Sequence, residues 1–240
     1  MRARLDRGAV SKASARRPAR AVEALRRGLV VSSQAPEGSP LREPRVLAAM
    51  AIAAAEAGAA GLRLEGAATI DVVRRKIKIP IIGLVKRGSA GVYITPSFDD
   101  ARRVVEAGAE LVAIDATVRR EGLAELVERI HRELHALVVA DVATAAEGVR
   151  AAEAGADVIS TTLAGYTTGE QPPATPDLRL VGRLARLLGA RAPVMAEGRI
   201  ATAAQVAAAF ERGAWCVCVG TAITRPDVLT KVFLEGCPKK

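Results

Sequence analysis

The stretch FDDARRVVEAGAELVAID, residues 98–115, contains the unit from which the fold of this chain can be predicted. Residues 98–107 have a helical pattern, and the apolar run Leu111–Ile114 has the length and composition of a short buried strand. Gly108 lies between them, where a helix ends most easily in a left-handed conformation that suits glycine. The stretch therefore predicts a helix, a tight turn and a strand, with the polar Asp115 directly after the strand.

The same unit recurs along the chain. The sequence Glu-Ala-Gly-Ala at 106–109 also occurs at 56–59 and 153–156, and Glu-Arg-Gly-Ala occurs at 211–214. Strands are predicted at Leu29–Ser33, Gly61–Leu64, Ile81–Val85, Leu111–Ile114, Leu137–Asp141, Val158–Thr161, Val194–Ala196 and Cys216–Val219. Helices are predicted at Pro44–Ala57, Ala67–Lys76, Phe98–Ala107, Leu123–His135, Thr144–Ala154, Asp177–Leu188, Thr202–Arg212 and Pro226–Leu234.

This alternation predicts right-handed βαβ units and a parallel sheet. Eight strands within residues 28–240 favour a closed (β/α)8 TIM barrel of the α/β class over an open doubly wound sheet. Half of the residues are hydrophobic but only 2% are aromatic, so the core must consist of Ala, Val, Leu and Ile. The chain is predicted to form a single catalytic domain over residues 24–240.

The positive charge is concentrated at the start of the chain. Residues 1–27 contain nine Lys or Arg and two acidic residues, while the rest accounts for only +2 of the net charge of +9. Residues 1–23 are predicted to be a basic, disordered extension, with a transit-type segment or an anion-binding arm as alternatives. The nearly neutral body argues against nucleic acid as a partner.

Several other classes of protein are disfavoured. No stretch is apolar and long enough for a membrane span, and three cysteines in 240 residues fit reduced thiols, so a cytoplasmic location is expected. The two histidines, His131 and His135, fall on a predicted helix away from the strand ends and are interpreted as surface or packing residues. We therefore expect no metal site and no cofactor; a dinucleotide-binding glycine motif is also missing.

Polar residues that end the strands are the candidates for chemistry, since active sites of parallel barrels lie at that face. Lys86 follows an apolar strand, and partial desolvation there would lower its pKa toward the range of a general base. Glu197 could pair with Lys86 across the barrel, or form a structural ion pair with an arginine. Asp141 could bind a sugar hydroxyl, orient Lys86, or be purely structural.

The loops after the last two strands favour a phosphate site. Gly198 and Gly220 would let backbone amides approach an anion, and a short helix start after Gly220 would direct its positive end there. Barrels often bind phosphate at these two loops. Arg199 and Arg225 lie near them in the sequence.

A series of motifs in unbroken order then identifies a resemblance. The chain resembles the N-acetylmannosamine-6-phosphate 2-epimerase family from Gly28 onward, on VSSQA (31–35), GLR (61–63), PIIGLVKR (80–87), VYITP (92–96), AIDAT (113–117), Asp141, TTLAGYT (161–167), AEGRI (196–200) and VGTAITRP (219–226). It departs from the family pattern at Ser33, where cysteine is common, in short loops after Arg87 and Thr117, and in its basic extension.

The resemblance implies interconversion of N-acetylmannosamine 6-phosphate and N-acetylglucosamine 6-phosphate at C2, in amino-sugar and sialic acid catabolism. It implies that the site residues have these roles: Lys86 as base and acid, Glu197 as proton partner or ring-opening helper, Gln34, Arg63, Asp141 and Arg225 as substrate-binding residues, and Gly198, Arg199, Gly220 and Thr221 as phosphate-binding residues. The apolar, alanine-rich exterior of the predicted helices is compatible with a homodimer.

Two alternatives stay open at this point. One is another metal-independent barrel enzyme for phosphosugars; pentose-phosphate epimerases fit less well because they use metal-binding histidines at strand ends. The other is a non-catalytic anion-binding or nucleic-acid-binding protein that uses the basic extension.

Overall fold

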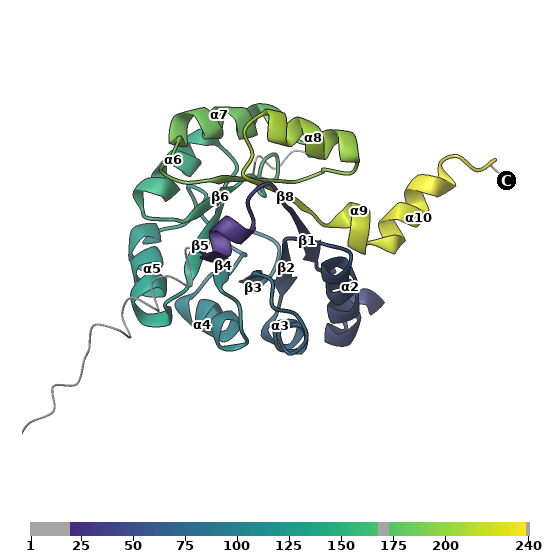
Figure 1. The fold of residues 1–240 in the computed structure, drawn as a ribbon, viewed down its shortest axis with the longest axis horizontal. Helices are drawn as coiled ribbons and strands as arrows, with labels where there is room; N and C mark the ends of the chain where they lie inside the picture. Colours follow the sequence, from purple (N-terminus) through teal and green to yellow (C-terminus); the bar gives the residue numbers. More distant parts are fainter. Residues whose placement is uncertain (1–19, 168–172, 239–240) are drawn as a thin grey trace, which may run out of the picture.

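The structure is a computed structural model that describes residues 20–167 and 173–238. Its strands close into a parallel barrel in sequence order, each pairing with the next and β8 with β1 (Figure 1). They are β1 (Leu29–Ser33), β2 (Gly61–Glu65), β3 (Ile81–Leu84), β4 (Leu111–Asp115), β5 (Leu137–Asp141), β6 (Val158–Ser160), β7 (Val194–Glu197) and β8 (Cys216–Val219). The predicted fold class is confirmed, and every predicted strand lies within one residue of its observed bounds.

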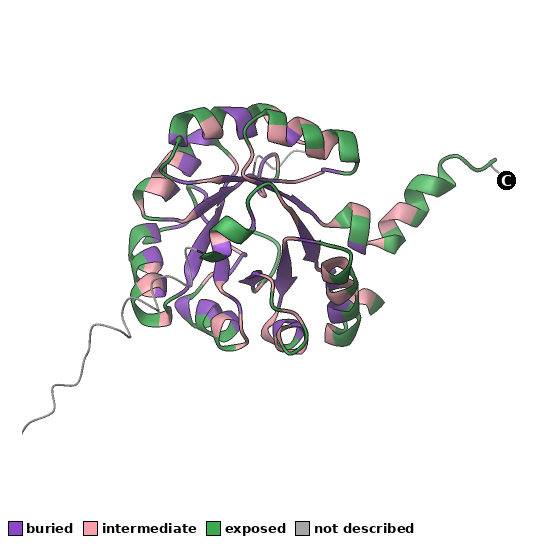
Figure 2. Ribbon diagram, in the orientation of Figure 1, coloured by how far each residue is buried: buried purple, intermediate pink, exposed green. Residues whose placement is uncertain are grey.

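The helices surround the barrel and cover its strands (Figure 2). They are α2 (Pro44–Glu56), α3 (Ala67–Arg74), α4 (Phe98–Glu106), α5 (Leu123–Arg129), α6 (Ala145–Glu153), α7 (Leu178–Leu188), α8 (Ala203–Glu211), α9 (Thr221–Thr224) and α10 (Pro226–Leu234), with the short turns η1 (Pro40–Arg42) and η2 (Ile130–Leu134). The helix predicted over residues 123–135 is divided, because its second half, η2, is a π-helical turn.

Local signals at the helix ends are confirmed. Gly58, Gly108, Gly155 and Gly213 follow helix ends with φ between 93° and 111°, a region in which a Cβ would be strained. Thr144 caps α6 in a capping box with Glu147, so two amides at the helix start are satisfied. These signals fix where each helix turns back toward the barrel.

Alternation along the strands decides which side chains enter the lumen. Ile82 and Leu84 of β3 belong to the inner cluster of apolar side chains, whereas Leu62 and Leu64 of β2 pack in the outer cluster beneath the helices. Residues 63 and 65, which alternate with the latter pair, therefore face inward. The same alternation directs polar or thiol side chains inward from six other strands: Ser32, Asp115, Asp141, Ser160, Glu197 and Cys218.

The N-terminal face of the barrel is closed by the segment just before β1. Leu25 is fully buried, and a Cβ at Gly61 would come within 2.4 Å of its side chain, so the glycine leaves the space that Leu25 fills. Trp215 donates from Nε1 to the carbonyl of Val22 at 3.0 Å. Ala21 and Val22, which the sequence assigned to the extension, thus pack with the barrel; residues 1–19 lie outside the described residues.

The last helix departs from the ring. α10 has no buried residue and projects away from the barrel (Figure 1). Its apolar side chains Val232, Phe233 and Leu234 are exposed, Phe233 by 78%. An apolar helix of this kind normally packs against a partner. Within the described part of the chain, no helix is long and apolar enough to cross a membrane.

Candidate active site

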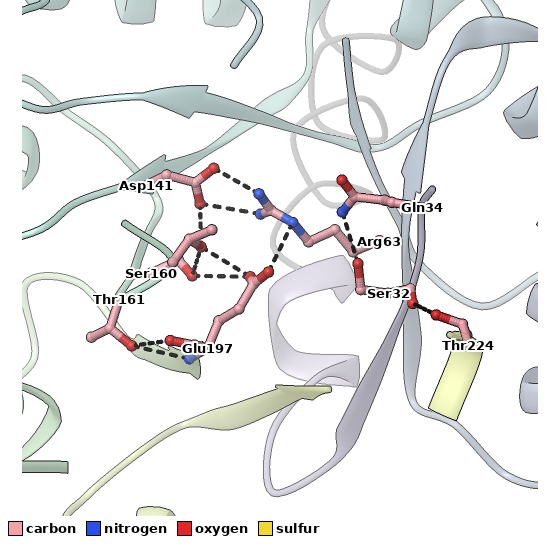
Figure 3. A network of polar contacts seen from close by, with 9 residues as sticks. Ser32, Gln34, Arg63, Asp141, Ser160, Thr161, Glu197 and Thr224 are labelled. Atoms are coloured by element: carbon pink, nitrogen blue, oxygen red, sulfur yellow. Dashed lines mark hydrogen bonds and ion pairs between the residues drawn. The ribbon is translucent and has the colours of Figure 1, made fainter. Parts of the chain in front are cut away.

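The C-terminal ends of the strands bring most of the predicted residues together around one buried arginine. Arg63 of β2 is 1% exposed and forms a bidentate pair with Asp141 of β5, at 3.1 Å and 2.7 Å (Figure 3). Its Nε lies 3.3 Å from Oε1 of Glu197 on β7, although the geometry is too poor for a hydrogen bond. The two carboxylates raise the pKa of Arg63 above its ordinary value despite the opposing effect of burial, so the guanidinium stays charged.

Hydroxyl groups of β6 and its following turn hold the two carboxylates. The Thr162 hydroxyl lies 2.7 Å from Asp141 Oδ1 and 3.0 Å from Glu197 Oε2, and Ser160 lies 3.3 Å from the same Glu197 oxygen. Thr161 accepts from the Glu197 amide at 3.0 Å and donates to its carbonyl at 2.9 Å. The sequence predicts that a strand ends at Thr161, with Thr162 directly after it, but it does not indicate that these residues fix the position of Glu197.

Asp141 is a supporting residue in this arrangement. It is fully buried, and its oxygens accept from Arg63 and Thr162, so it positions Arg63 rather than facing the cavity. Burial raises the pKa of Asp141 above its ordinary value, in spite of the opposing charge of Arg63. One arginine thus faces two carboxyl groups, and the Thr162 hydroxyl, which has a single proton to donate, lies between them.

Lys86 stands just beyond β3, at the mouth of the barrel. Solvent reaches the side chain, while the surrounding strand ends enclose the remainder of it. This enclosure lowers the pKa of Lys86 from its ordinary 10.5, with Glu65 opposing and Arg63 adding to the effect. The lowered pKa agrees with the expectation for a general base.

The expected ion pair between Lys86 and Glu197 is absent, since no carboxylate of a described residue lies within 4 Å of the lysine ammonium. Glu197 pairs instead with Arg63, the other sequence-based interpretation of this carboxylate. The physical reason is that Arg63 is buried from water and must find its counter-charges among the side chains around it.

The segment after Lys86 folds back beside residues 85–87, just beyond β3, and hydrogen bonds hold it there. Lys86 forms a single antiparallel bridge with Ile94, and the amide of Arg87 donates to the carbonyl of Tyr93 at 3.0 Å. The buried Arg120 donates to the carbonyls of residues 94–96 and to that of Asp115. This brings Tyr93 to the rim of the mouth, where burial raises the pKa of its phenol and keeps it protonated.

Two adjoining cavities open at the mouth, of about 560 Å³ and 640 Å³. Their volumes suit a small ligand. The first also reaches Arg63, Glu197 and the loops after β7 and β8. Both are lined by Gln34, Lys86, Tyr93, Gly220 and Thr221. Gln34 donates to Ser32 at 2.7 Å, and its buried amide oxygen has no hydrogen-bond partner among the residues that the structure describes.

The two loops expected to bind phosphate differ in which polar groups remain available to a ligand. Arg199 donates to the carbonyls of Thr175 and Ala164, at 2.9 Å and 2.7 Å, so it stabilises the loop it lies on. At Gly220, a Cβ would come within 3.2 Å of Ser32, and the turn of α9 begins there. The amides just after such a helix start lack intrahelical acceptors.

Arg225 follows α9 and lines the larger cavity, where it pairs with Asp227 at 2.6 Å. Its side chain is 21% exposed. The cavity is therefore lined by an arginine from the segment after α9, although this arginine is already paired with a carboxylate.

The histidines lie away from the mouth, as expected. His131 of η2 lies 2.7 Å from Asp157 Oδ2, an oxygen that also accepts from the amide of Val138 at the start of β5. Among residues 20–167 and 173–238, no group of three or more His, Cys, Asp or Glu is arranged to hold a metal ion.

Comparison with known proteins gives one consistent result. Residues 47–239 match the sequence profile of a family described as "Putative N-acetylmannosamine-6-phosphate epimerase". Proteins from Cutibacterium acnes and Caldanaerobacter subterraneus, both named "Putative N-acetylmannosamine-6-phosphate 2-epimerase", are 44% identical to the chain. These alignments cover 90% of the chain and 96% of the first relative, and 89% and 92% for the second.

One solved structure agrees with this result. The N-acetylmannosamine-6-phosphate 2-epimerase from Clostridium perfringens superposes with a TM-score of 0.84 at 35% identity, covering 90% of this chain and 96% of that one. A lactate oxidase from Pediococcus acidilactici, 13% identical with a TM-score of 0.62, shares the fold alone.

Proposed function

This chain belongs to the N-acetylmannosamine-6-phosphate 2-epimerase family, and from that premise we propose how the mouth of its barrel carries out the reaction. The protein is an isomerase that interconverts N-acetylmannosamine 6-phosphate and N-acetylglucosamine 6-phosphate. The observation that carries the mechanism is a lysine of lowered pKa, Lys86, at the rim of the cavity that Glu197 also lines.

The reaction requires a proton to leave C2 and another to arrive on the opposite face. C2 is acidic only when the sugar ring is open, because the carbanion is then an enolate conjugated with the C1 aldehyde. Lys86 takes the C2 proton and becomes an ammonium, and the C–H electron pair moves into the enolate. A lowered pKa increases the fraction of neutral lysine near pH 7 that can act as this base.

Glu197 is the second member of the site. Its carboxylate lines the cavity, while Thr161, Thr162 and Arg63 fix it from behind. A carboxyl group held in this way can deliver or accept a proton at the sugar, either at C2 or during ring opening. Arg63 and Asp141 are positioning residues in this proposal, and Gln34 and Tyr93 offer polar groups to the sugar from the rim.

The phosphate is assigned to the loops after β7 and β8. The amides at Gly220 and Thr221 and the side chain of Arg225 would bind it, while Gly198 and Arg199 shape the adjoining wall. Arg225→Ala should raise KM for the phosphorylated sugar with little change in kcat, and Arg199→Ala should act in the same direction. Equal use of the unphosphorylated sugar by the parent protein would contradict a phosphate site.

The reaction is tested by incubating the protein with N-acetylmannosamine 6-phosphate in D₂O with a chelator and following the C2 proton by NMR. Formation of the gluco epimer with deuterium at C2 is expected, without any added metal or cofactor. Protein that is folded yet neither converts the sugar nor exchanges the proton would point to another phosphosugar. A role in amino-sugar and sialic acid catabolism, and a cytoplasmic location, remain predictions.

The exposed apolar side chains of α10 lead us to propose that the protein is a homodimer. This helix has no buried residue and exposes Val232, Phe233 and Leu234, while Val228, Leu229 and Val232 line the cavity at the mouth. A second copy that covers this apolar face would also shield the site from solvent. Sedimentation of the parent and of Phe233→Asp tests it: the parent should be dimeric and the variant shifted toward monomer. A monomeric parent at micromolar concentration would refute the dimer.

A further inference from the structure

Glu65 is the last residue of β2, and only one of its two carboxylate oxygens accepts a hydrogen bond from a described residue. Oε1 accepts from Nη2 of Arg42 at 2.7 Å, while Oε2 is buried and has no hydrogen-bond partner among the described residues. The side chain is only 8% exposed. A buried carboxylate oxygen without a donor is unfavourable, so a hydrogen-bond donor that reached this oxygen would stabilise it.

Lys86 is placed to be that donor. Glu65 pairs in register with Leu84 of β3, and Lys86 follows Leu84 by two residues, so both side chains leave their strands on the lumen side. The lysine ammonium has three donors and a flexible stem, and no carboxylate of a described residue lies within 4 Å of it. A free acceptor and a free donor thus emerge from neighbouring strands at the same rim.

Arg42 is the cation that Glu65 already contacts. It belongs to η1, in the segment between β1 and α2, and its Nη1 also donates to the carbonyl of Ala35 at 2.8 Å. The guanidinium therefore partly neutralises Glu65 and ties the β1 loop to β2. Arg42 and Lys86 line the same cavity.

We propose that Glu65 is a positioning residue that receives the Lys86 ammonium once Lys86 has taken the C2 proton, and that Arg42 tunes this contact. The inference rests on the proposed function, in which Lys86 is the base. Transfer of the proton from C2 to the Lys86 nitrogen leaves the electron pair on the enolate. The Lys86–Glu65 contact then balances the new positive charge until a proton returns to the opposite face of C2.

The charges around Lys86 determine the direction in which each substitution should shift the pKa of this lysine. Burial lowers the pKa of Lys86 most, Glu65 raises it, Arg63 lowers it, and Glu197 and Asp141 raise it more weakly; the phenol of Tyr93 stands at the same rim. Removing the charge of Glu65 should therefore lower this pKa further. Removing Arg42 should raise it, because Glu65 then acts on Lys86 without compensation.

The experiment compares pH profiles of kcat/KM for the parent, Glu65→Gln, Arg42→Gln and the control Glu43→Gln. Glu43 is exposed and lies beside Arg42. The acid limb, which reports the deprotonation of Lys86, should move by about 0.5 to 1 pH unit to lower pH in Glu65→Gln. It should move to higher pH in Arg42→Gln and stay in place in the control. Shifts of equal sign in both variants, or no shift in either, would overturn the proposal.

A second measurement needs no substrate. The rate at which a small anhydride acylates Lys86, followed by peptide mass spectrometry as a function of pH, reports the same proton directly. Opposite shifts in the two variants are expected here as well. If the parent failed to act on N-acetylmannosamine 6-phosphate while these shifts were present, the proposed function would fail and the Glu65–Lys86 contact would stand. If Glu65→Gln did not fold, Arg42→Gln and Glu65→Asp would decide between the outcomes.

Discussion

Replacing Arg63 with methionine removes the guanidinium from the centre of the polar cluster and keeps an unbranched but shorter apolar side chain. Asp141, which is fully buried, would lose two hydrogen bonds of 3.1 Å and 2.7 Å and retain only the Thr162 hydroxyl. Breaking a buried ion pair by removing one partner costs about 3 to 5 kcal/mol. We therefore expect the free energy of unfolding of Arg63→Met to fall by that amount at pH 8.

The loss should depend on pH. Without Arg63, the pKa of Asp141, which burial already raises, would rise further. A carboxyl group whose folded pKa lies above its unfolded value of about 3.9 binds more protons in the folded state than in the unfolded state. Stability then falls as pH rises through the window between the two values. The destabilisation should therefore be larger at pH 8 than at pH 5.

Urea unfolding followed by circular dichroism measures both effects. With an m-value of about 2 to 3 kcal/mol/M, the midpoint should fall by roughly 1 to 2.5 M at pH 8. Arg75→Met is the matched control, because Arg75 makes a similar two-bonded pair with Asp71 at the surface, where the side chains are 74% and 50% exposed. The control should change stability by less than about 1 kcal/mol. A similar change in both variants, or a loss independent of pH, would refute the argument.

Three further results are expected. Lys86→Ala should abolish turnover in a steady-state assay while leaving the circular dichroism spectrum unchanged, and a near-normal rate would exclude Lys86 as the base. Leu25→Ala should destabilise by about 2 to 5 kcal/mol in urea, because it empties a fully buried position beside Gly61, and KM should not change. The Asp157 contact raises the pKa of His131, so the stability it contributes is present below about pH 6.5 and is lost as pH rises through the folded value. His131→Gln should therefore destabilise more at pH 5.5 than at pH 9, by less than about 1 kcal/mol since the side chain is partly exposed.

Much of the fold could be predicted because its signals are local. Short apolar runs, the glycines after helix ends and the Thr144 cap each act over a few residues, and they agree with the structure. The path of α10 could not be predicted, because an apolar helical pattern does not say what the helix packs against. The π-helical turn η2 also leaves no clear mark in the hydrophobic pattern of residues 123–135.

The sequence predicts which residues lie at the ends of the strands, but it does not predict which of these residues contact one another. A position at the end of a parallel strand places Lys86, Asp141 and Glu197 at one face whatever their partners. The choice of Arg63, rather than Lys86, as the partner of Glu197 depends on the depth of each cation in the lumen, which follows from strand register. The free oxygen of Glu65 was missed for a related reason, since the strand was expected to end at residue 64.

The contact that closes the bottom of the barrel has a consequence for synthesis of the chain. The carbonyl of Val22 and the indole of Trp215 are separated by 193 residues. In the same way, β1 can pair with β8 only after the last strand has been synthesised. At about 5 to 20 residues per second, a ribosome needs roughly 10 to 40 s to make the intervening chain. During that time the segment around Leu25 and the open edge of β1 lack their final partners, so the growing chain is most prone to aggregation before its last strand emerges.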